Sequence, residues 1–172
     1  MEYYDLIRSR ESIRNYDPEQ KVPEEVLNRI LEAGRLAPSA SNRQPWTFVL
    51  VSSEKKLHEV TASYPRKWFQ DAPHVLAVVG NKTQSWVRPY DGYNSIETDL
   101  AIAMDHMILA AENEGVGACW IIAFDYDKLA SALGLSENEV VYCITPLGYP
   151  KTGFRKKGNK IRKPLSEIIR RL

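Results

Sequence analysis

Apolar positions along the chain form two kinds of pattern, and these patterns alternate. Runs of β-branched and apolar residues at 47–52 and 74–80 are typical of strands buried on both faces. A helical pattern at 22–40, with Pro23 in its first turn and acids after it, predicts a helix that Pro38 ends. The alternation of helices with buried strands predicts a layered α/β domain.

Shorter signals complete the predicted order of elements. They predict helices at 2–9, 54–62 and 126–133 and strands at 117–124 and 140–150. Ser53 and Asp125 stand at the starts of two of these helices, where a side-chain oxygen caps free backbone N–H groups. Residues 81–94, rich in turn formers and aromatics, predict a loop or lid.

The pattern at 96–114 predicts a helix that is apolar on most of its surface. Its polar residues recur at close to a seven-residue spacing, which leaves only a narrow wet stripe; they are Asp99, Asp105, His106, Glu112 and Asn113. One domain of this size can hardly cover such a helix on all sides. We therefore expect it to be central, with one side packed against a second subunit.

Composition and charge exclude several classes of function. The 172 residues suit a single domain, 1–172, with 44% apolar and 26% charged residues. A net charge of +1 gives no global field that would recruit nucleic acid or a membrane, so we expect neither as a partner. The apolar runs are too short to cross a bilayer and the first ten residues lack a signal-peptide core, so we expect a cytoplasmic protein.

Cysteine and histidine usage argues against metal and triad chemistry. Cys119 and Cys143 lie in apolar stretches, which predicts buried free thiols in a reducing compartment. The three histidines fall on separate segments without metal-ligand spacing, so we expect no metal site. Neither a G-x-G-x-x-G fingerprint nor a P-loop follows any predicted strand. A bound phosphate would therefore be held by side chains.

Basic residues gather near both ends of the chain. The tail (residues 151–172) carries six cations within nine residues, Arg155, Lys156, Lys157, Lys160, Arg162 and Lys163. A solvated tail is one interpretation, and a weak nucleic-acid patch is a poorer one because no aromatics interleave with the charges. Lys160 and Arg162 would share one face of an extended segment. Joined to Arg10, Ser12 and Arg14, they would form a pocket of charge-assisted donors for a phosphate.

A polar turn follows the helix predicted at 22–40. Its sequence is APSASNRQPW, residues 37–46. An ordinary helix-to-strand connection would explain the Ser, Asn and Pro residues by local turn chemistry. Its side chains nevertheless offer more donors and acceptors than a turn requires, and they would suit the polar edge of a flat heterocycle.

Three blocks of the sequence resemble the nitroreductase family of FMN flavoproteins, in a short form. The N-terminal block is SRESIRNYDPEQKVPEEVLNRILEAGRLAPSASNRQPWTFVLV, with the order R-x-S-x-R-x-[FY], helix, A-P-S-x-x-N-x-Q-P-W. GVGACWIIAF and LGYPK…KIRKPLSEII resemble later family blocks. The resemblance implies a three-layer α-β-α fold (α/β, or α+β) with a mostly antiparallel central sheet, a homodimer, and FMN at the subunit interface.

The resemblance also assigns cofactor-binding positions. Arg10 and Ser12 match residues that bind the FMN phosphate and ribityl chain, and Arg14 matches a cation beside the flavin pyrimidine. Lys160 and Arg162 match a pair that closes on the phosphate. The matching positions of the turn, which approaches the flavin from the other subunit, are Pro38, Ser39, Ser41, Asn42 and Gln44.

Two departures from the family pattern concern the flavin ring. Many relatives have an acid and a glycine near flavin N5, where this chain has Ile122 and Ala123. A backbone N–H of Ala123 would still reach N5, but the role of the acid is absent. Larger members also hold the ring with an Asn and a Lys on the helix before the second strand. The comparable stretch here, YPRKWFQDAPH, keeps neither, and Lys67 is a candidate to substitute for them.

The implied activity is hydride transfer from NADH or NADPH to flavin N5, and then reduction of a nitroaromatic, quinone or similar acceptor by a ping-pong mechanism. The cofactor carries this chemistry, so no catalytic side chain is expected. Trp86, Tyr90 and Tyr93 are candidates to stack on an aromatic acceptor, although packing would explain them equally well. The alternatives are a different flavin reaction (reductive dehalogenation or flavin breakdown) and a flavin-binding protein without productive turnover.

Overall fold

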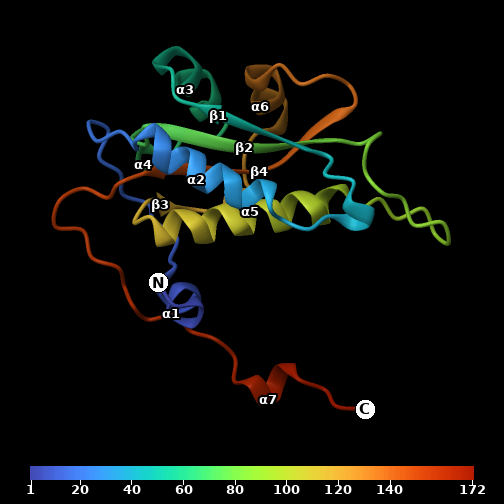
Figure 1. The fold of residues 1–172 in the computed structure, drawn as a ribbon. Coiled ribbons are helices and arrows are strands. Elements are labelled where there is room, and N and C mark those ends of the chain that lie inside the picture. The colour runs from blue at the N-terminus through green and yellow to red at the C-terminus, as the bar shows by residue number, and fades with distance from the viewer.

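A four-stranded sheet lies at the centre of the structure, a computed structural model that describes residues 1–172 (Figure 1). Its strands are β1 (Trp46–Val51), β2 (His74–Asn81), β3 (Gly117–Ala118) and β4 (Glu139–Gly148). Their order in the sheet is β1-β2-β4-β3, and all three pairings are antiparallel. Strands β2 and β4 therefore form the middle of the sheet, while β1 and β3 form its edges.

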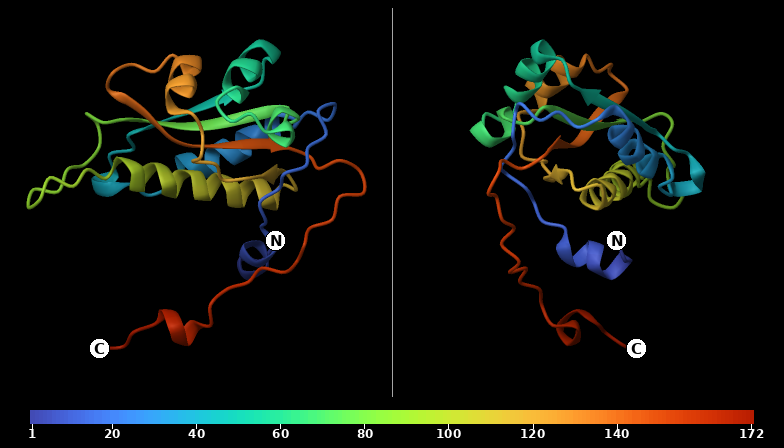
Figure 2. Two further views of the ribbon diagram at one scale, coloured as in Figure 1. Left: turned by 180° about the vertical axis from the view of Figure 1, so that it is seen from behind. Right: turned by 60° about the vertical axis from the view of Figure 1, so that its left-hand side comes forward.

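Helices cover both faces of the sheet, which gives three layers (Figures 1 and 2). Helices α2 (Glu24–Arg35) and α5 (Ile96–Asn113) lie on one face, and α3 (Glu54–Thr61) and α6 (Tyr126–Leu133) lie on the other. The remaining helices are short: α1 (Tyr3–Ser9), α4 (Lys67–Gln70), α7 (Leu165–Ile168) and a 3₁₀ turn at Ala40–Asn42. The α-β-α architecture with an antiparallel sheet confirms the predicted fold class.

Strand β2 is the centre of two hydrophobic cores. Leu76 and Val78 join a cluster of 16 buried residues beneath α2 and α5, while Val75, Ala77 and Val79 join a cluster of 11 on the opposite face. Successive side chains of a strand point to opposite faces, so a fully apolar strand must be covered on both. The prediction of a strand buried on both faces is confirmed for β2.

Both edge strands differ from the predictions. Strand β1 was expected to be buried on both faces, but only Val51 is fully buried, because β1 has a neighbour on one side only. The strand predicted at 117–124 is reduced to two residues. At Cys119 the backbone N–H donates to Thr145 Oγ1 (3.1 Å), which interrupts the ladder, and one further bridge joins Ile121 to Ile144. Ile122 therefore lies beyond the sheet.

Helix ends depart from the prediction in two places. Pro23 precedes α2 as its N-cap residue instead of occupying the first turn, and α2 ends at Arg35, before Pro38. The residue before a proline is disfavoured in the helical region, so the helix ends early. The Ser53 side chain makes no capping hydrogen bond, which contradicts its predicted role. Asp125 does cap α6, accepting a hydrogen bond from the Lys128 backbone N–H.

Helix α5 is central, as predicted, but its polar stripe is not uniformly wet. Asp99 and Glu112 are 1% and 8% exposed, which contradicts the predicted solvated positions. Each buried carboxylate is hydrogen-bonded, as burial requires. Ser95 Oγ and the Ala40 backbone N–H donate to Asp99 at 2.7 and 2.8 Å, and Ser9 Oγ donates to Glu112 at 2.7 Å.

The close approach of α5 to β2 leads to a prediction about stability. A methyl group on Gly80 would lie 2.6 Å from Ile96 Cδ1 and 2.8 Å from Leu100 Cδ1. Because packed interiors resist added volume, we expect Gly80→Ala to lower the free energy of unfolding by about 1–3 kcal/mol. Urea unfolding measures this change. An unchanged midpoint would show that α5 can move away from β2 without cost.

Candidate functional site

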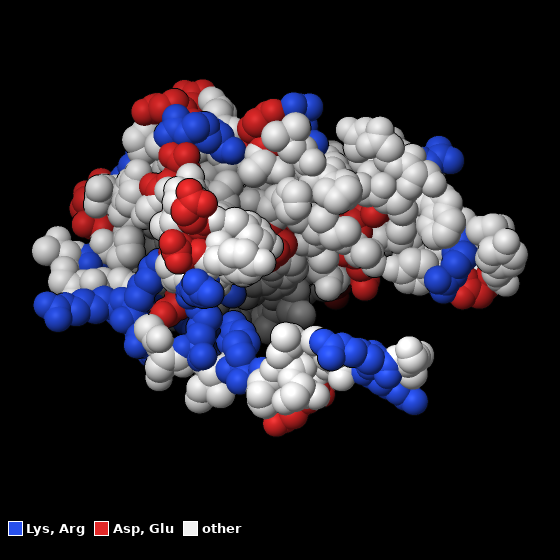
Figure 3. Space-filling model, turned by 60° about the horizontal axis from the view of Figure 1, so that its bottom comes forward, with Lys and Arg blue, Asp and Glu red and all other residues white.

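A cavity of about 580 Å³ lies where the segment after α1 meets the tail. We call it the cationic cavity, because one acid, Glu11, lines it together with six cations, Arg10, Arg14, Arg155, Lys157, Lys160 and Arg162. Ser12 lines it as well. Figure 3 shows Lys and Arg side chains gathered where the tail approaches the body of the molecule. The two basic clusters at opposite ends of the sequence therefore meet in space.

The N-terminal side of the cavity is held by strand β3 and a small core. The Ile13 backbone N–H donates to the Ala118 carbonyl at 2.9 Å, and the Ile13 and Tyr16 side chains are buried. Because successive side chains of this extended segment point to opposite sides, the burial of Ile13 leaves Ser12 and Arg14 facing the cavity. The Arg14 guanidinium lies 5.8 Å from the centre of the Trp68 ring, which places a cation over an aromatic face.

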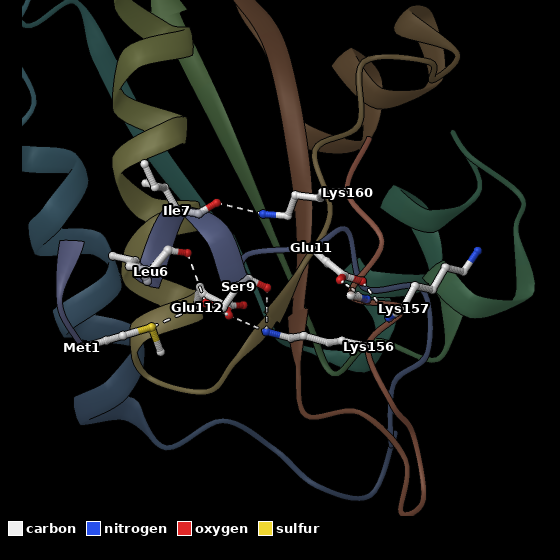
Figure 4. Close-up of polar contacts among 10 residues, drawn as sticks. Met1, Leu6, Ile7, Ser9, Glu11, Glu112, Lys156, Lys157 and Lys160 are labelled. Carbon is white, nitrogen blue, oxygen red and sulfur yellow. Dashed lines mark hydrogen bonds and ion pairs between the residues drawn. The ribbon is translucent and has the colours of Figure 1, made fainter. Parts of the chain in front are cut away.

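The tail forms the other side of the cavity and runs without helix or strand from Gly153 to Pro164 (Figure 2). Lys160 Nζ donates to the Ile7 carbonyl at 2.8 Å, which joins the tail to α1 (Figure 4). Lys160 and Arg162 both line the cationic cavity. Burial lowers the pKa of Lys160, and repulsion by Arg10 and Arg162 lowers it further. A bound anion would relieve that repulsion.

Two carboxylates, Glu112 and Glu11, fasten the basic segment of the tail to the rest of the chain (Figure 4). Glu112, from the last turn of α5, forms an ion pair with Lys156, and Lys156 also donates to the Ser9 carbonyl at 3.2 Å. Glu11 accepts hydrogen bonds from two consecutive backbone N–H groups, Lys157 at 3.0 Å and Gly158 at 2.7 Å. The tail is thus attached at two neighbouring points within its basic segment.

The attachment through Glu11 is expected to be lost in acid. The N–H of Gly158 is the largest cause that lowers the pKa of Glu11 below its ordinary 4.5, and the N–H of Lys157 and the charges of Lys156 and Lys160 act in the same direction. The ionised carboxylate therefore stabilises docking at neutral pH, and this stabilisation disappears as the pH falls through the lowered pKa. NMR chemical shifts of the Lys157 and Gly158 amides, followed from about pH 6 to pH 3, should show the loss of these hydrogen bonds. In Glu11→Gln, which has no carboxylate at this position, the pH-dependent change of these two amide shifts should be absent.

The polar turn after α2 does not line the cationic cavity of its own chain. Three of its non-glycine residues have positive φ: Ser41 at 50°, Asn42 at 53° and Gln44 at 50°. Such a run is strained and persists only where the surroundings enforce it. Asp99 of α5 stabilises this conformation by accepting a hydrogen bond from the Ala40 N–H. The Ser39 hydroxyl also accepts a hydrogen bond from the Gln44 N–H, at 2.9 Å. Pro38 lies at the start of this turn, before the residues with positive φ.

The residues predicted near flavin N5 lie apart from the cationic cavity. Ile122 is 58% exposed and lines a second, mostly apolar cavity of about 600 Å³ with Phe124, Tyr126 and Tyr142. Ala123 is exposed beside it. The structure therefore gathers Arg10, Ser12, Arg14, Lys160 and Arg162 in one place, and it places Ile122, Ala123 and the turn elsewhere.

The segment at 81–94 forms a projecting hairpin. A bridge pairs Val87 with Asn94, and Arg88 forms two hydrogen bonds to Asp91 (2.7 and 2.6 Å) while stacking on Tyr93. Tyr90, at its tip, is 93% exposed and contacts no cavity described above.

Lys67, the candidate to substitute for the missing Asn and Lys at the flavin ring, does not line the cationic cavity. It pairs instead with Asp71 at 2.9 Å. Trp68, the next residue, stands beside Arg14.

Sequence reasoning missed the roles of Glu11, Glu112 and Asp99. The available signals were an acid inside the basic segment at 10–14 and two acids on an otherwise apolar helix. Neither signal identifies the residues to which these acids are hydrogen-bonded.

Both cysteines are buried and free, as predicted. Burial raises the pKa of Cys143 to about 12, which makes this thiol inert. No group of three or more His, Cys, Asp and Glu residues is arranged to hold a metal ion. No helix has both the length and the apolar character that a bilayer span requires.

Comparisons with known proteins agree with this architecture. The nitroreductase family model matches residues 7–65 and 59–149. A protein of Archaeoglobus fulgidus named "Putative NADH dehydrogenase/NAD(P)H nitroreductase" is 32% identical over 150 residues, which are 85% of this chain and 84% of that protein.

Solved structures extend the similarity to the fold. A nitroreductase family protein from Clostridium difficile 630 superposes with a TM-score of 0.90 at 31% identity, over 99% of this chain and 98% of that chain. A Desulfovibrio desulfuricans structure described as "a putative nitroreductase in complex with fmn" gives a TM-score of 0.79 at 25% identity, over 96% and 94% of the two chains. With this fold and a family match across most of its length, the chain belongs to the nitroreductase family.

Proposed function

We propose that this protein is an FMN-dependent oxidoreductase that takes hydride from NADH or NADPH and reduces a small aromatic acceptor, such as a nitroaromatic or a quinone. The observation that carries the proposal is the meeting of Arg10, Ser12 and Arg14 with Lys160 and Arg162 around one cavity. A family relative solved with FMN supports the choice of cofactor.

The donor chemistry of the cationic cavity fits the phosphate of FMN. Arginine and lysine side chains make charge-assisted hydrogen bonds to phosphate oxygens, and Ser12 adds a hydroxyl donor. The volume of about 580 Å³ falls within the range of about 300–1,000 Å³ that is typical of cofactor sites. Side chains would thus replace the glycine-rich loop that the sequence lacks.

Arg14 would tune the flavin ring. FMN, when bound, supplies the hydride and electron chemistry. A fixed cation beside the pyrimidine edge would stabilise negative charge there and make reduction more favourable. The Arg14 guanidinium lies 5.8 Å from the centre of the Trp68 ring, and attraction to this aromatic face would help to hold the charge in place.

We propose a homodimer in which each flavin contacts both chains. The turn at 38–44 does not reach the cavity of its own chain, which supports its use at the partner's site. Large apolar side chains that one chain leaves exposed support a partner that covers them; those on α1 and the tail include Tyr3, Tyr4, Ile7, Ile161, Leu165 and Ile168. Exposed apolar surface of this kind typically marks an interface.

Absorbance of the purified protein tests the cofactor. We expect a yellow protein that holds one FMN per chain and that NADH or NADPH bleaches under anaerobic conditions, followed by reoxidation with a nitroaromatic or a quinone. Steady-state lines should be parallel, as a ping-pong order requires. A colourless protein that takes up no added FMN would disprove the proposal.

A second candidate function is flavin binding without productive turnover. Ile122 favours it, because the family resemblance implies an acid at this position and isoleucine cannot replace the polar role of an acid. A yellow protein that neither nicotinamide nucleotide bleaches would support this second function over the first.

A further inference from the structure

We propose that Glu11 is a positioning residue, which holds the tail so that Lys160 and Arg162 reach the phosphate of the cofactor. The inference rests on the proposed function and assigns a role to an acid within the anion site.

The contacts of Glu11 are made with the backbone of the tail. Its two carboxylate oxygens accept from adjacent N–H groups, Oε2 from Lys157 at 3.0 Å and Oε1 from Gly158 at 2.7 Å (Figure 4). Gly158 has φ of +68°, a conformation that glycine adopts without strain. Lys160 follows two residues later, so this turn positions its backbone, while a hydrogen bond to the Ile7 carbonyl (2.8 Å) positions its ammonium group.

Few other contacts fix this part of the tail. Of the backbone N–H groups of residues 155–163, only those of Lys157 and Gly158 are hydrogen-bonded, and both donate to Glu11. The residue before them, Lys156, is anchored to Glu112 through its side chain. The Arg162 guanidinium donates only to the neighbouring Ile161 carbonyl. Without Glu11, the segment that carries Lys160 and Arg162 would lose its direct backbone attachment.

The charge of Glu11 and its proposed positioning role predict opposite effects on phosphate binding when the carboxylate is removed. A carboxylate that lines a cavity of six cations lowers the attraction of that cavity for an anion. On charge alone, neutralising Glu11 would tighten phosphate binding. If Glu11 positions the tail, the same change weakens binding, because the two cations must then be ordered at the moment the anion binds. The sign of the effect therefore separates the two roles.

FMN titration of the full-length apoprotein, followed by quenching of flavin fluorescence, measures this sign. We expect Glu11→Ala to raise the dissociation constant about 10- to 100-fold, consistent with the loss of two hydrogen bonds to a charged group. Glu11→Gln should lie between Glu11→Ala and the unsubstituted protein, because an amide oxygen can still accept one N–H. Asp5→Asn, on α1 and outside the cavity, is the control with the same charge change and should bind FMN normally.

Riboflavin, which lacks the phosphate, separates positioning from a general effect on the flavin site. The Glu11 variants should lose their preference for FMN over riboflavin while their affinity for riboflavin stays the same. Glu11→Ala that binds FMN as tightly as the unsubstituted protein, or more tightly, would overturn the inference and leave the proposed function intact. An unsubstituted protein that binds no FMN would overturn both.

Discussion

Replacing Arg10 and Arg162 together with alanine is expected to weaken FMN binding by about 10²- to 10⁴-fold. Each arginine comes from a different end of the chain, and both line the cationic cavity. A hydrogen bond to a charged group contributes about 1.5–3 kcal/mol, so two of them give about 3–6 kcal/mol. The variant should be purified without yellow colour, and isothermal titration with FMN gives the change in affinity.

Arg8→Ala provides the matched control for the double variant. Arg8 lies on α1 two residues before Arg10, but it pairs with Asp5 at 3.7 Å and does not line the cavity. It should bind FMN as the unsubstituted protein does. Tight flavin binding by the double variant would mean that the phosphate is bound elsewhere, and the proposed site would be wrong.

Placing a carboxylate on the open face of α5 is expected to separate the proposed dimer and release FMN. Ile102, Asp105, His106 and Leu109 recur at helical spacing, and none of them is fully buried in one chain. If this face packs against the partner, Ile102→Asp buries an unpaired charge at a cost of several kcal/mol. The dimer dissociation constant should then rise about 100-fold or more. Sedimentation velocity with detection of flavin absorbance measures both effects in one experiment.

Ile102→Leu keeps the volume and apolar character of the side chain and should remain a yellow dimer. Circular dichroism should show native helix content in both variants, which separates dissociation from unfolding. A monomeric Ile102→Asp variant that retains one FMN per chain would contradict the use of the turn at 38–44 by the partner's site.

Hydrophobic patterning predicted the central elements of the fold well, because their environments are uniform along their length. Strand β2 is buried on both sides and α5 is apolar on most of its surface, so each has an unambiguous pattern. The edge strands were predicted less accurately. No pattern within β1 shows that it has one neighbour only, and β3 is interrupted by a hydroxyl from Thr145, a residue distant in the sequence.

The basic half of the site was predictable because cations at an otherwise neutral surface are conspicuous in a sequence. The acids that organise it were not. Glu11 is separated by 146 residues from Lys157, so no local spacing links them. Asp99 and Glu112 have the sequence signature of a wet stripe, and only the positions of Ala40, Ser9 and Lys156 show that they are buried and paired.

The attachment of the tail to the segment after α1 also has a consequence for biosynthesis. The sheet and the helices that cover it are complete by Gly148, whereas Lys160 and Arg162 leave the ribosome later. We expect the nascent chain to acquire its core first and to bind its chromophore only after Lys160 and Arg162 have left the ribosome. A premature stop codon after Pro150 should therefore yield a folded but colourless polypeptide.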